Sequence, residues 1–155
     1  MRQAIKWFDW AAVLWLATFL VFTASWALFP ASFWFEVRRV EVLQQTTPDG
    51  FNLLAVDREI HRPFLGTWHA TVRSLPGNTV VCQGSGGTTY RPGSDLPQPL
   101  NMGWWIDDPD CRTGGALRAG EYYLSTTWTV QNPWGILPDR KITIDSNVFS
   151  VGEGQ

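Results

Sequence analysis

The chain has 155 residues and a formal net charge of −2, which leaves room for one ordinary domain and an appendage. Charged residues make up 17% of it, and both signs are interspersed after Phe35, so the sequence lacks the basic face of a nucleic-acid-binding protein and the polybasic patch of a lipid-binding surface. We therefore expect no nucleic-acid partner.

The N-terminal segment is strongly apolar, since residues 10–35 contain no Asp, Glu, Lys, Arg or His. As a helix, Ala11–Phe29 would be about 28 Å long, close to the hydrocarbon thickness of a bilayer. Pro30 would then end the helix. The sequence predicts a cytoplasmic tail (1–9), a transmembrane helix with an interfacial flank (10–35) and a globular domain (36–155). The lipid bilayer is thus the first expected partner.

Tryptophans mark both ends of this segment. The chain has ten of them, and Trp7 and Trp10 precede the apolar run while Trp26 and Trp34 flank its far end. Indole rings gather at the two interfaces of a membrane. We therefore predict that these four residues lie at the membrane interface.

A cleaved secretory signal is the alternative reading of the same segment. Arg2 and Lys6 form a basic start, and Thr23-Ala24-Ser25 offers small residues for cleavage. The apolar stretch nevertheless continues through Phe29 to Phe35, which is longer than the apolar core of a signal. This length favours a retained helix.

After Glu36 the hydrophobic pattern changes to the alternation that is typical of half-buried strands. It is clearest in residues 67–73 and 122–130, where every second residue is apolar or aromatic except for Thr126. Shorter alternations and apolar runs raise the number of predicted strands to about eight: Val40-Val42, Leu54-Val56, Thr79–Cys82, Met102–Ile106, Ile142-Ile144 and Phe149-Val151. Turn sequences separate them: Thr47-Pro48-Asp49-Gly50, Pro76-Gly77-Asn78 and Pro133-Trp134-Gly135.

These features predict a mostly β fold, an antiparallel β-sandwich of about seven to nine strands after one transmembrane α-helix. Leu117, Gly120 and Tyr122 stand in the order Leu-x-x-Gly-x-Tyr before a long strand. This order resembles the tyrosine corner of immunoglobulin-like and fibronectin type III domains. The resemblance implies an immunoglobulin-like sandwich in which the Tyr122 hydroxyl bonds to backbone upstream.

Two cysteines, Cys82 and Cys111, form an even pair in a small β domain, which favours a disulfide in an oxidising compartment. Two unrelated buried thiols are the alternative. Basic residues on the two sides of the helix balance, so the cysteines alone favour an extracytoplasmic domain, in a bacterial periplasm or on a virion. The bond would join a predicted loop, Gln83–Pro99, to a second one, Asp107–Gly115, and one side of the domain would become a contact surface.

Chemically reactive constellations are weak in this sequence. Asp107, Asp108 and Asp110 form the only candidate for calcium, without the spacing of a known calcium loop. His61 and His69 have no nucleophile beside them, and Gly-x-Ser-x-Gly is absent. We therefore expect no enzymatic activity, no catalytic residue and no cofactor.

The sequence leaves three hypotheses for function. The first is a non-enzymatic membrane-anchored interaction protein that binds another protein, and its layout is similar to that of small uncharacterised membrane proteins encoded by bacteriophages and bacteria. The second is an accessory subunit of a membrane complex. The third is a secreted carbohydrate- or ligand-binding module with a cleaved signal, in which Trp104, Trp105 or Trp134 would provide stacking surfaces.

Overall fold

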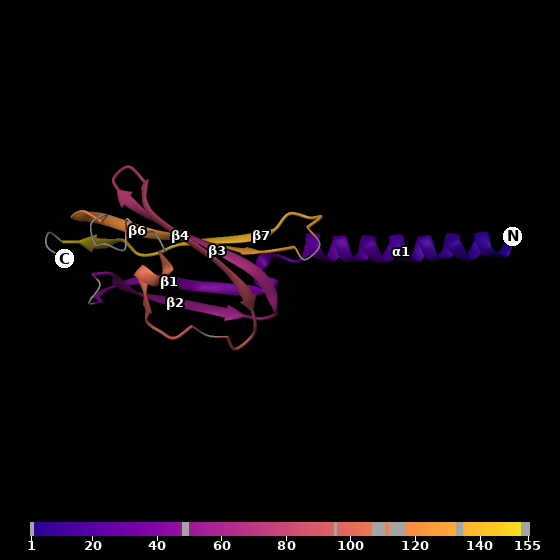
Figure 1. Ribbon diagram of the computed structural model, residues 1–155, viewed down its shortest axis with the longest axis horizontal. Coiled ribbons are helices and arrows are strands. Elements are labelled where there is room, and N and C mark those ends of the chain that lie inside the picture. Colours follow the sequence, from indigo (N-terminus) through magenta and orange to yellow (C-terminus); the bar gives the residue numbers. More distant parts are fainter. Residues whose placement is uncertain are drawn as a thin grey trace. The chain divides into compact units, whose positions relative to one another are not determined.

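The chain forms two compact units, Met1–Pro30 and Ala31–Gln155. The first is a helix and the second is built mostly from strands (Figure 1). The computed structural model describes residues 2–47, 50–94, 96–106, 111, 117–132 and 135–152.

Helix α1 (Arg2–Leu28) begins earlier than the predicted span, because residues 2–10 contain no proline or glycine to interrupt it. Its window Asp9–Leu28 has 20 residues and a mean hydropathy of 1.9, which is long and apolar enough to cross a membrane. A signal sequence would meet the same test. Length and composition therefore agree with the prediction of a spanning helix and leave the alternative open.

The three hydroxyl side chains in the apolar stretch of α1 bond to the helix backbone. The Thr18 hydroxyl donates to the Leu14 carbonyl at 2.9 Å, the Thr23 hydroxyl to Leu20 at 3.0 Å and the Ser25 hydroxyl to Val21 at 2.7 Å. In a hydrocarbon environment every polar group needs such an internal partner. These hydroxyls therefore add little cost to burying the helix in lipid.

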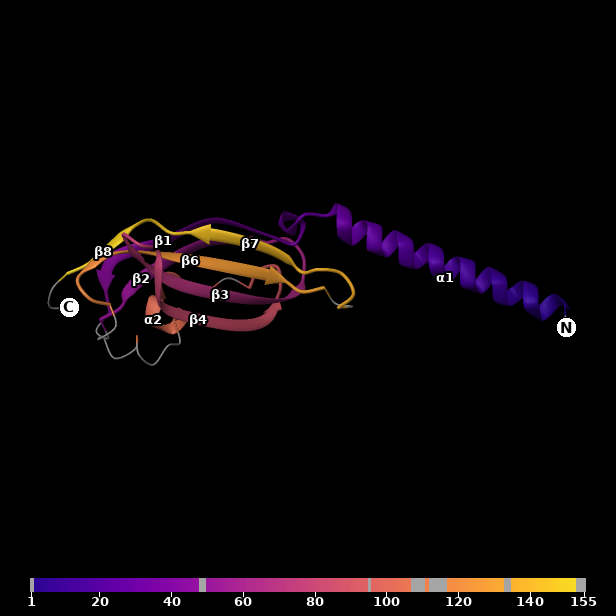
Figure 2. The ribbon, with the colours of Figure 1, turned by 90° about the horizontal axis from the view of Figure 1, so that it is seen from above.

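The second unit holds eight strands within the described residues. They are β1 (Phe35–Thr46), β2 (Asn52–Ile60), β3 (Phe64–Leu75), β4 (Thr79–Tyr90), β5 (Leu100–Asn101), β6 (Gly120–Val130), β7 (Arg140–Asp145) and β8 (Phe149–Val151), with two short helices, η1 (Ala31–Phe33) and α2 (Met102–Trp105). One antiparallel sheet has the order β1-β2-β5 and the other β4-β3-β6-β7, with β8 also paired to β6 (Figure 2). The predicted mostly β, antiparallel fold is confirmed.

The two sheets pack face to face through aromatic and aliphatic side chains. The Phe35 ring of β1 lies 5.3 Å from the Phe64 ring and 6.1 Å from the Trp128 ring, between centroids, and both partners belong to the other sheet. The predicted alternation of β6 places five residues in this core: Tyr122, Leu124, Thr126, Trp128 and Val130. Period-2 patterning thus identified the core face correctly.

The predicted strand Met102–Ile106 is wrong, because its first four residues form the helical turn α2. The Asn101 side-chain oxygen accepts from the Gly103 amide at 2.8 Å and caps the turn. Gly103 also has to be small, since a Cβ there would collide with the Phe51 ring. A short apolar run does not by itself distinguish a strand from a buried helical turn.

The predicted loop Gln83–Pro99 is also wrong over its first half, because strand β4 continues to Tyr90. Gly86 pairs with Trp68 of β3, and a Cβ at Gly86 would lie 2.8 Å from the Trp68 Nε1 atom. The glycine therefore makes room for an indole that lies across the strand. Glycines indicate a loop in the sequence, yet here they accommodate a cross-strand tryptophan.

Candidate binding site

A small cavity of about 80 Å³ opens in the β unit beside helix α2. Five of its eight lining residues are aromatic, and none carries a carboxylate: Arg58, Trp68, Thr88, Tyr90, Leu96, Trp104, Trp105 and Trp128. They come from β2, β3, β4, β6, α2 and the segment between β4 and β5. Both sheets therefore contribute to one aromatic site.

Three tryptophans form the inner wall of this cavity. The Trp105 ring lies 5.2 Å from the Trp68 ring and 6.0 Å from the Trp128 ring, and it meets the latter edge to face at 88°. Trp105 and Trp128 are only 2% and 1% exposed, and neither indole N–H has a hydrogen-bond partner among the described residues. A buried N–H group without a partner destabilises the fold, and weak contacts between an N–H group and a neighbouring ring, in the edge-to-face geometry, can offset part of this loss.

Trp104 differs sharply from its neighbour in the same helical turn. It is 60% exposed, whereas Trp105 is buried. The cap at Asn101 fixes the turn, so the Trp105 indole faces the core and the Trp104 indole faces solvent at the edge of the cavity. An exposed aromatic face beside an aromatic cavity is suited to stacking on a ligand ring.

Arg58 and Tyr90 are the titratable side chains of the cavity lining. The Arg58 guanidinium lies over the Tyr90 ring, 5.3 Å from its centroid, and donates to the Ser94 carbonyl at 3.3 Å. Burial raises the pKa of Tyr90, and the nearby Arg58 charge lowers it by less. The tyrosine is therefore a neutral hydroxyl at physiological pH, and the positive charge of Arg58 makes the cavity unsuited to a cationic ligand.

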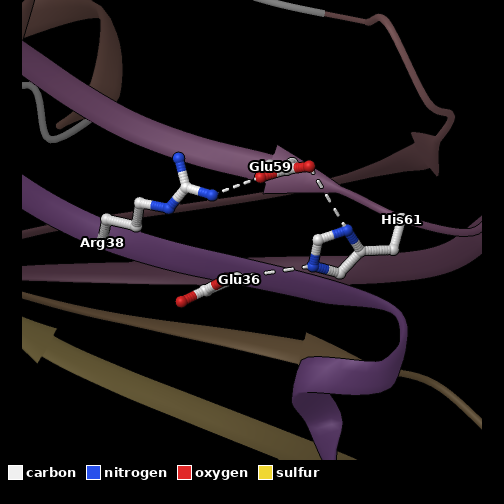
Figure 3. Close-up of polar contacts among 4 residues, drawn as sticks. All are labelled: Glu36, Arg38, Glu59 and His61. Carbon is white, nitrogen blue, oxygen red and sulfur yellow. Dashed lines mark hydrogen bonds and ion pairs between the residues drawn. The ribbon is translucent and has the colours of Figure 1, made fainter.

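A second polar cluster lies on the outer face of the β1-β2 pair (Figure 3). Glu36 and Glu59 stand directly opposite each other, an arrangement that is unfavourable for two carboxylates. Arg38 forms an ion pair with Glu59, and the His61 ring nitrogens lie 3.6 Å from a Glu59 oxygen and 3.9 Å from a Glu36 oxygen. The Arg38 charge thus offsets part of the repulsion between the carboxylates, and the His61 ring lies close to both of them.

This cluster has the character of surface ion pairing. The Arg38 and Glu59 side chains are 52% and 50% exposed, and such pairs are worth only about 0–1 kcal/mol. The residues that the structure describes contain no group of three His, Cys, Asp or Glu side chains arranged to hold a metal ion. We therefore place the candidate site in the aromatic cavity.

Cys82 and Cys111 are joined by a disulfide, with Cα atoms 6.1 Å apart. The pairing that the sequence favoured is present, but Cys82 belongs to strand β4. The bond therefore ties the segment between α2 and β6 to a strand, and does not join two loops as predicted. Cys111 is therefore anchored to the sheet that carries Trp68.

Other predicted residues are placed as follows. The Tyr122 hydroxyl donates to the Arg118 carbonyl at 2.7 Å, four residues upstream, and Gly120 precedes it at the start of β6. Trp10 is 68% exposed, Trp26 is 6% exposed and Trp34 is half-buried. The Trp7 side chain, Trp134 and the calcium candidates Asp107, Asp108 and Asp110 lie outside the described residues. An interfacial role for the tryptophans stays a prediction.

Sequence reasoning missed most of the aromatic cavity. It singled out Trp104 and Trp105 but not Arg58, Trp68 or Tyr90, which are far from α2 in the chain. One signal was present, since the glycines opposite Trp68 indicate a position where a bulky group needs space. Which bulky group that is depends on the β3-β4 register.

No protein-family model, curated protein or solved structure matches this chain.

Proposed function

We propose that the chain is a non-enzymatic, membrane-anchored binding protein that presents an immunoglobulin-like domain outside the cytoplasm. One observation carries this proposal: an apolar helix of spanning length is followed, with no intervening linker domain, by a separate compact β unit. Large apolar side chains along the helix are exposed, including Leu14 at 64% and Val21 at 67%. A bilayer would cover them.

The strand order supports the immunoglobulin-like assignment. In these domains strands A, B and E form one sheet and C, F and G the other, and an added C′ strand extends the second sheet next to C. In chain order, β1, β2 and β5 correspond to A, B and E, while β3, β6 and β7 correspond to C, F and G, with β4 as C′. The bond from the Tyr122 hydroxyl, near the start of β6, to the Arg118 carbonyl agrees with a tyrosine corner at strand F.

The disulfide supports an extracytoplasmic location of the domain. Disulfides persist in the periplasm and at cell or virion surfaces, whereas cytosolic thiols are kept reduced. The Cys82–Cys111 bond therefore favours a domain outside the cytoplasm and the N-terminus of α1 inside.

Fractionation of cells that express the full chain tests the anchor. We expect the chain to stay in the membrane pellet after alkaline extraction, with an intact mass that includes Met1–Phe29. External protease added to spheroplasts should digest the β unit, and a cysteine-reactive mass tag should modify neither Cys82 nor Cys111 without reductant. A soluble product that starts after residue 25 would show instead a cleaved signal and would overturn the anchor.

Binding of a ligand ring in the aromatic cavity is a second candidate function, favoured by the exposure of Trp104. A volume of about 80 Å³ is too small for a whole cofactor but admits part of one ring, with Trp104 at the edge as a stacking surface. Arg58, Thr88 and Tyr90 supply hydrogen-bonding groups, and Arg58 disfavours cations. A neutral sugar ring fits these requirements.

Titration with neutral oligosaccharides tests this second function. Chitohexaose and maltohexaose, added to the detergent-solubilised full chain, should quench tryptophan fluorescence saturably, and Trp104→Ala should abolish the response. The exposed Leu75→Ala, at the far end of β3, is the matched control and should bind normally. Equal signals from Trp104→Ala and the native chain would exclude stacking on Trp104.

A further inference from the structure

We propose that one end of the β unit rests on the surface of the lipid bilayer that α1 crosses. We call it the entry end and define it by η1 (Ala31–Phe33), Leu65 and Ile136. The proposal rests on the membrane anchor proposed above, and it adds a second contact with lipid, made by the β unit itself.

The connection from α1 to the β unit is too short to contain a flexible spacer. Only Phe29 and Pro30 separate the last residue of α1 from Ala31. Three residue steps span at most about 11 Å, so Ala31 stays within that distance of the end of α1 whatever angle the two units adopt.

Backbone hydrogen bonds fix η1 to the strands that follow it. The Trp34 amide donates to the Ala31 carbonyl at 3.0 Å, and the Trp34 carbonyl accepts from the amides of His61 and Arg62 at 2.8 and 3.1 Å. β1 then begins at Phe35. These bonds hold the start of the domain, so it does not serve as a flexible spacer, and a helix anchored in the bilayer would keep the entry end close to the interface.

Two exposed aliphatic side chains belong to this same end of the β unit. The Gln131 amide donates to the Leu65 carbonyl at 2.9 Å, which joins the end of β6 to the start of β3. Ile136 follows in the β6-β7 connection, where the Asn132 side chain donates to the Leu137 carbonyl at 3.2 Å. Ile136 is 61% exposed and Leu65 is 55% exposed. Figure 2 shows this connection at the opposite end of the domain from β8.

The neighbouring charge also suits a headgroup region. The Arg62 guanidinium lies 4.2 Å from the centroid of the Phe33 ring of η1. An arginine stacked on an aromatic ring keeps its apolar part on the ring while its charge stays hydrated or meets a phosphate. Aliphatic, aromatic and cationic groups together are the composition of an interfacial contact.

Val148 provides a matched comparison at the other end of the domain. It is 51% exposed, close to the value for Leu65, and lies between β7 and β8. The neighbouring Asn147 side chain donates to the Val42 carbonyl at 3.0 Å, far along β1 from its start. Strand β7, with six residues, separates the two ends by about 20 Å. If these side chains were only exposed surface residues, those at the two ends would have the same environment. If the entry end contacts the bilayer, only the side chains at that end lie near lipid.

Spin labelling of the full chain in vesicles tests the proposal. We would place a maleimide nitroxide at Ile136→Cys, Val148→Cys and Leu20→Cys, keep the native disulfide unreduced, and reconstitute each variant in phosphatidylcholine vesicles. The accessibility of each label to oxygen and to a water-soluble nickel complex reports its depth. We expect Ile136→Cys to show a ratio of oxygen to nickel accessibility several times that of Val148→Cys.

The Leu20→Cys label, in the middle of α1, separates the two proposals. If it is lipid-exposed and the labels at 136 and 148 are equally aqueous, the entry-end contact is wrong and the anchor stands. If the label at residue 20 is itself aqueous, the anchor fails and the entry-end contact fails with it. Leu65→Cys is a second reporter at the entry end, and it must agree with Ile136→Cys for the proposal to hold.

Discussion

Helix α1 and the β unit contain the same kinds of apolar side chain, but they use them in opposite ways. Leu14 and Leu16 of the helix are 64% and 54% exposed, whereas Leu54 and Leu124 of the β unit are fully buried. The β unit thus has its own hydrophobic core, whereas the helix leaves most of its large apolar side chains exposed. The comparison shows that hydrophobicity alone does not indicate how a segment is stabilised.

Truncation of a core aromatic should have the largest effect on the β unit. Trp128→Ala removes an indole that is 1% exposed and should lower the unfolding free energy by about 3–5 kcal/mol. Urea denaturation of the full chain in detergent, followed by circular dichroism, measures the change. The exposed Trp104→Ala should change it by less than about 0.5 kcal/mol. Similar losses in both variants would contradict the assignment of Trp128 to the core.

A charge in the helix should instead affect membrane insertion. Leu20→Arg places a guanidinium near the centre of the apolar window and should cost about 2.5–3.5 kcal/mol of insertion free energy. The fraction of protein that resists alkaline extraction would report this loss. Val80→Arg, at a 43% exposed position of β4, is the control and should leave retention unchanged. If Leu20→Arg stays in the membrane as well as the native chain does, the apolar side chains of α1 are not covered by lipid, and this contrast with the β unit fails.

The disulfide should stabilise the β unit alone. Its cysteines are 29 residues apart, so the double variant Cys82→Ala/Cys111→Ala should lose about 3 kcal/mol, mainly because the unfolded chain becomes less constrained. Thermal unfolding in detergent measures the loss in the β signal. The helical signal of α1 should be unaffected, and its parallel loss would show that the two units unfold together.

A methyl group at the cross-strand glycine should have a smaller effect. Gly86→Ala brings a Cβ within 2.8 Å of the Trp68 ring, and the forced shift should cost about 1–3 kcal/mol. Gly152→Ala, where no atom lies within 4 Å of the added carbon, should be close to neutral in the same urea denaturation. A neutral Gly86→Ala would mean that the indole does not lie across β4.

The smallest expected effect appears at alkaline pH. Burial raises the pKa of Tyr90 above its ordinary value of 10.0, so the folded state holds this proton more tightly than the unfolded state. Its contribution to stability is therefore complete below pH 10 and is lost as the pH rises through the folded pKa. Tyr90→Phe should show a shallower loss of unfolding free energy above about pH 10 than the native chain. Identical pH profiles would contradict the burial of this hydroxyl.

Period-2 patterning was sufficient for the strands that have one buried face. Leu124, Trp128 and Val130 alternate with half-buried residues along β6, and the same period identified Ala70 and Val72 on β3. Patterning failed where small residues stand opposite large ones. Gly86 by itself indicated a loop, but its pairing with Trp68 on β3 shows that the glycine leaves space for the indole within a strand.

The aromatic cavity could be predicted only in part. Trp104 and Trp105 are adjacent in the sequence, but nothing local indicates that one is exposed and the other buried. That difference depends on the capped turn of α2 and on the contacts of Trp105 with Trp68 of β3 and Trp128 of β6. Arg58 also lines the cavity only because the fold places β2 beside it, and nothing near Arg58 in the sequence indicates this position.

The sequence by itself determined that an apolar helix of spanning length precedes a mostly β domain, because helix length and strand alternation are properties of neighbouring residues. The number of cysteines also predicted the disulfide between Cys82 and Cys111. Only the tertiary structure decided that β4 runs through the glycines, that Met102–Trp105 turns as a helix, and that five aromatic residues meet around one cavity. These features depend on contacts between residues far apart in the chain, where packing of side chains overrides local preference.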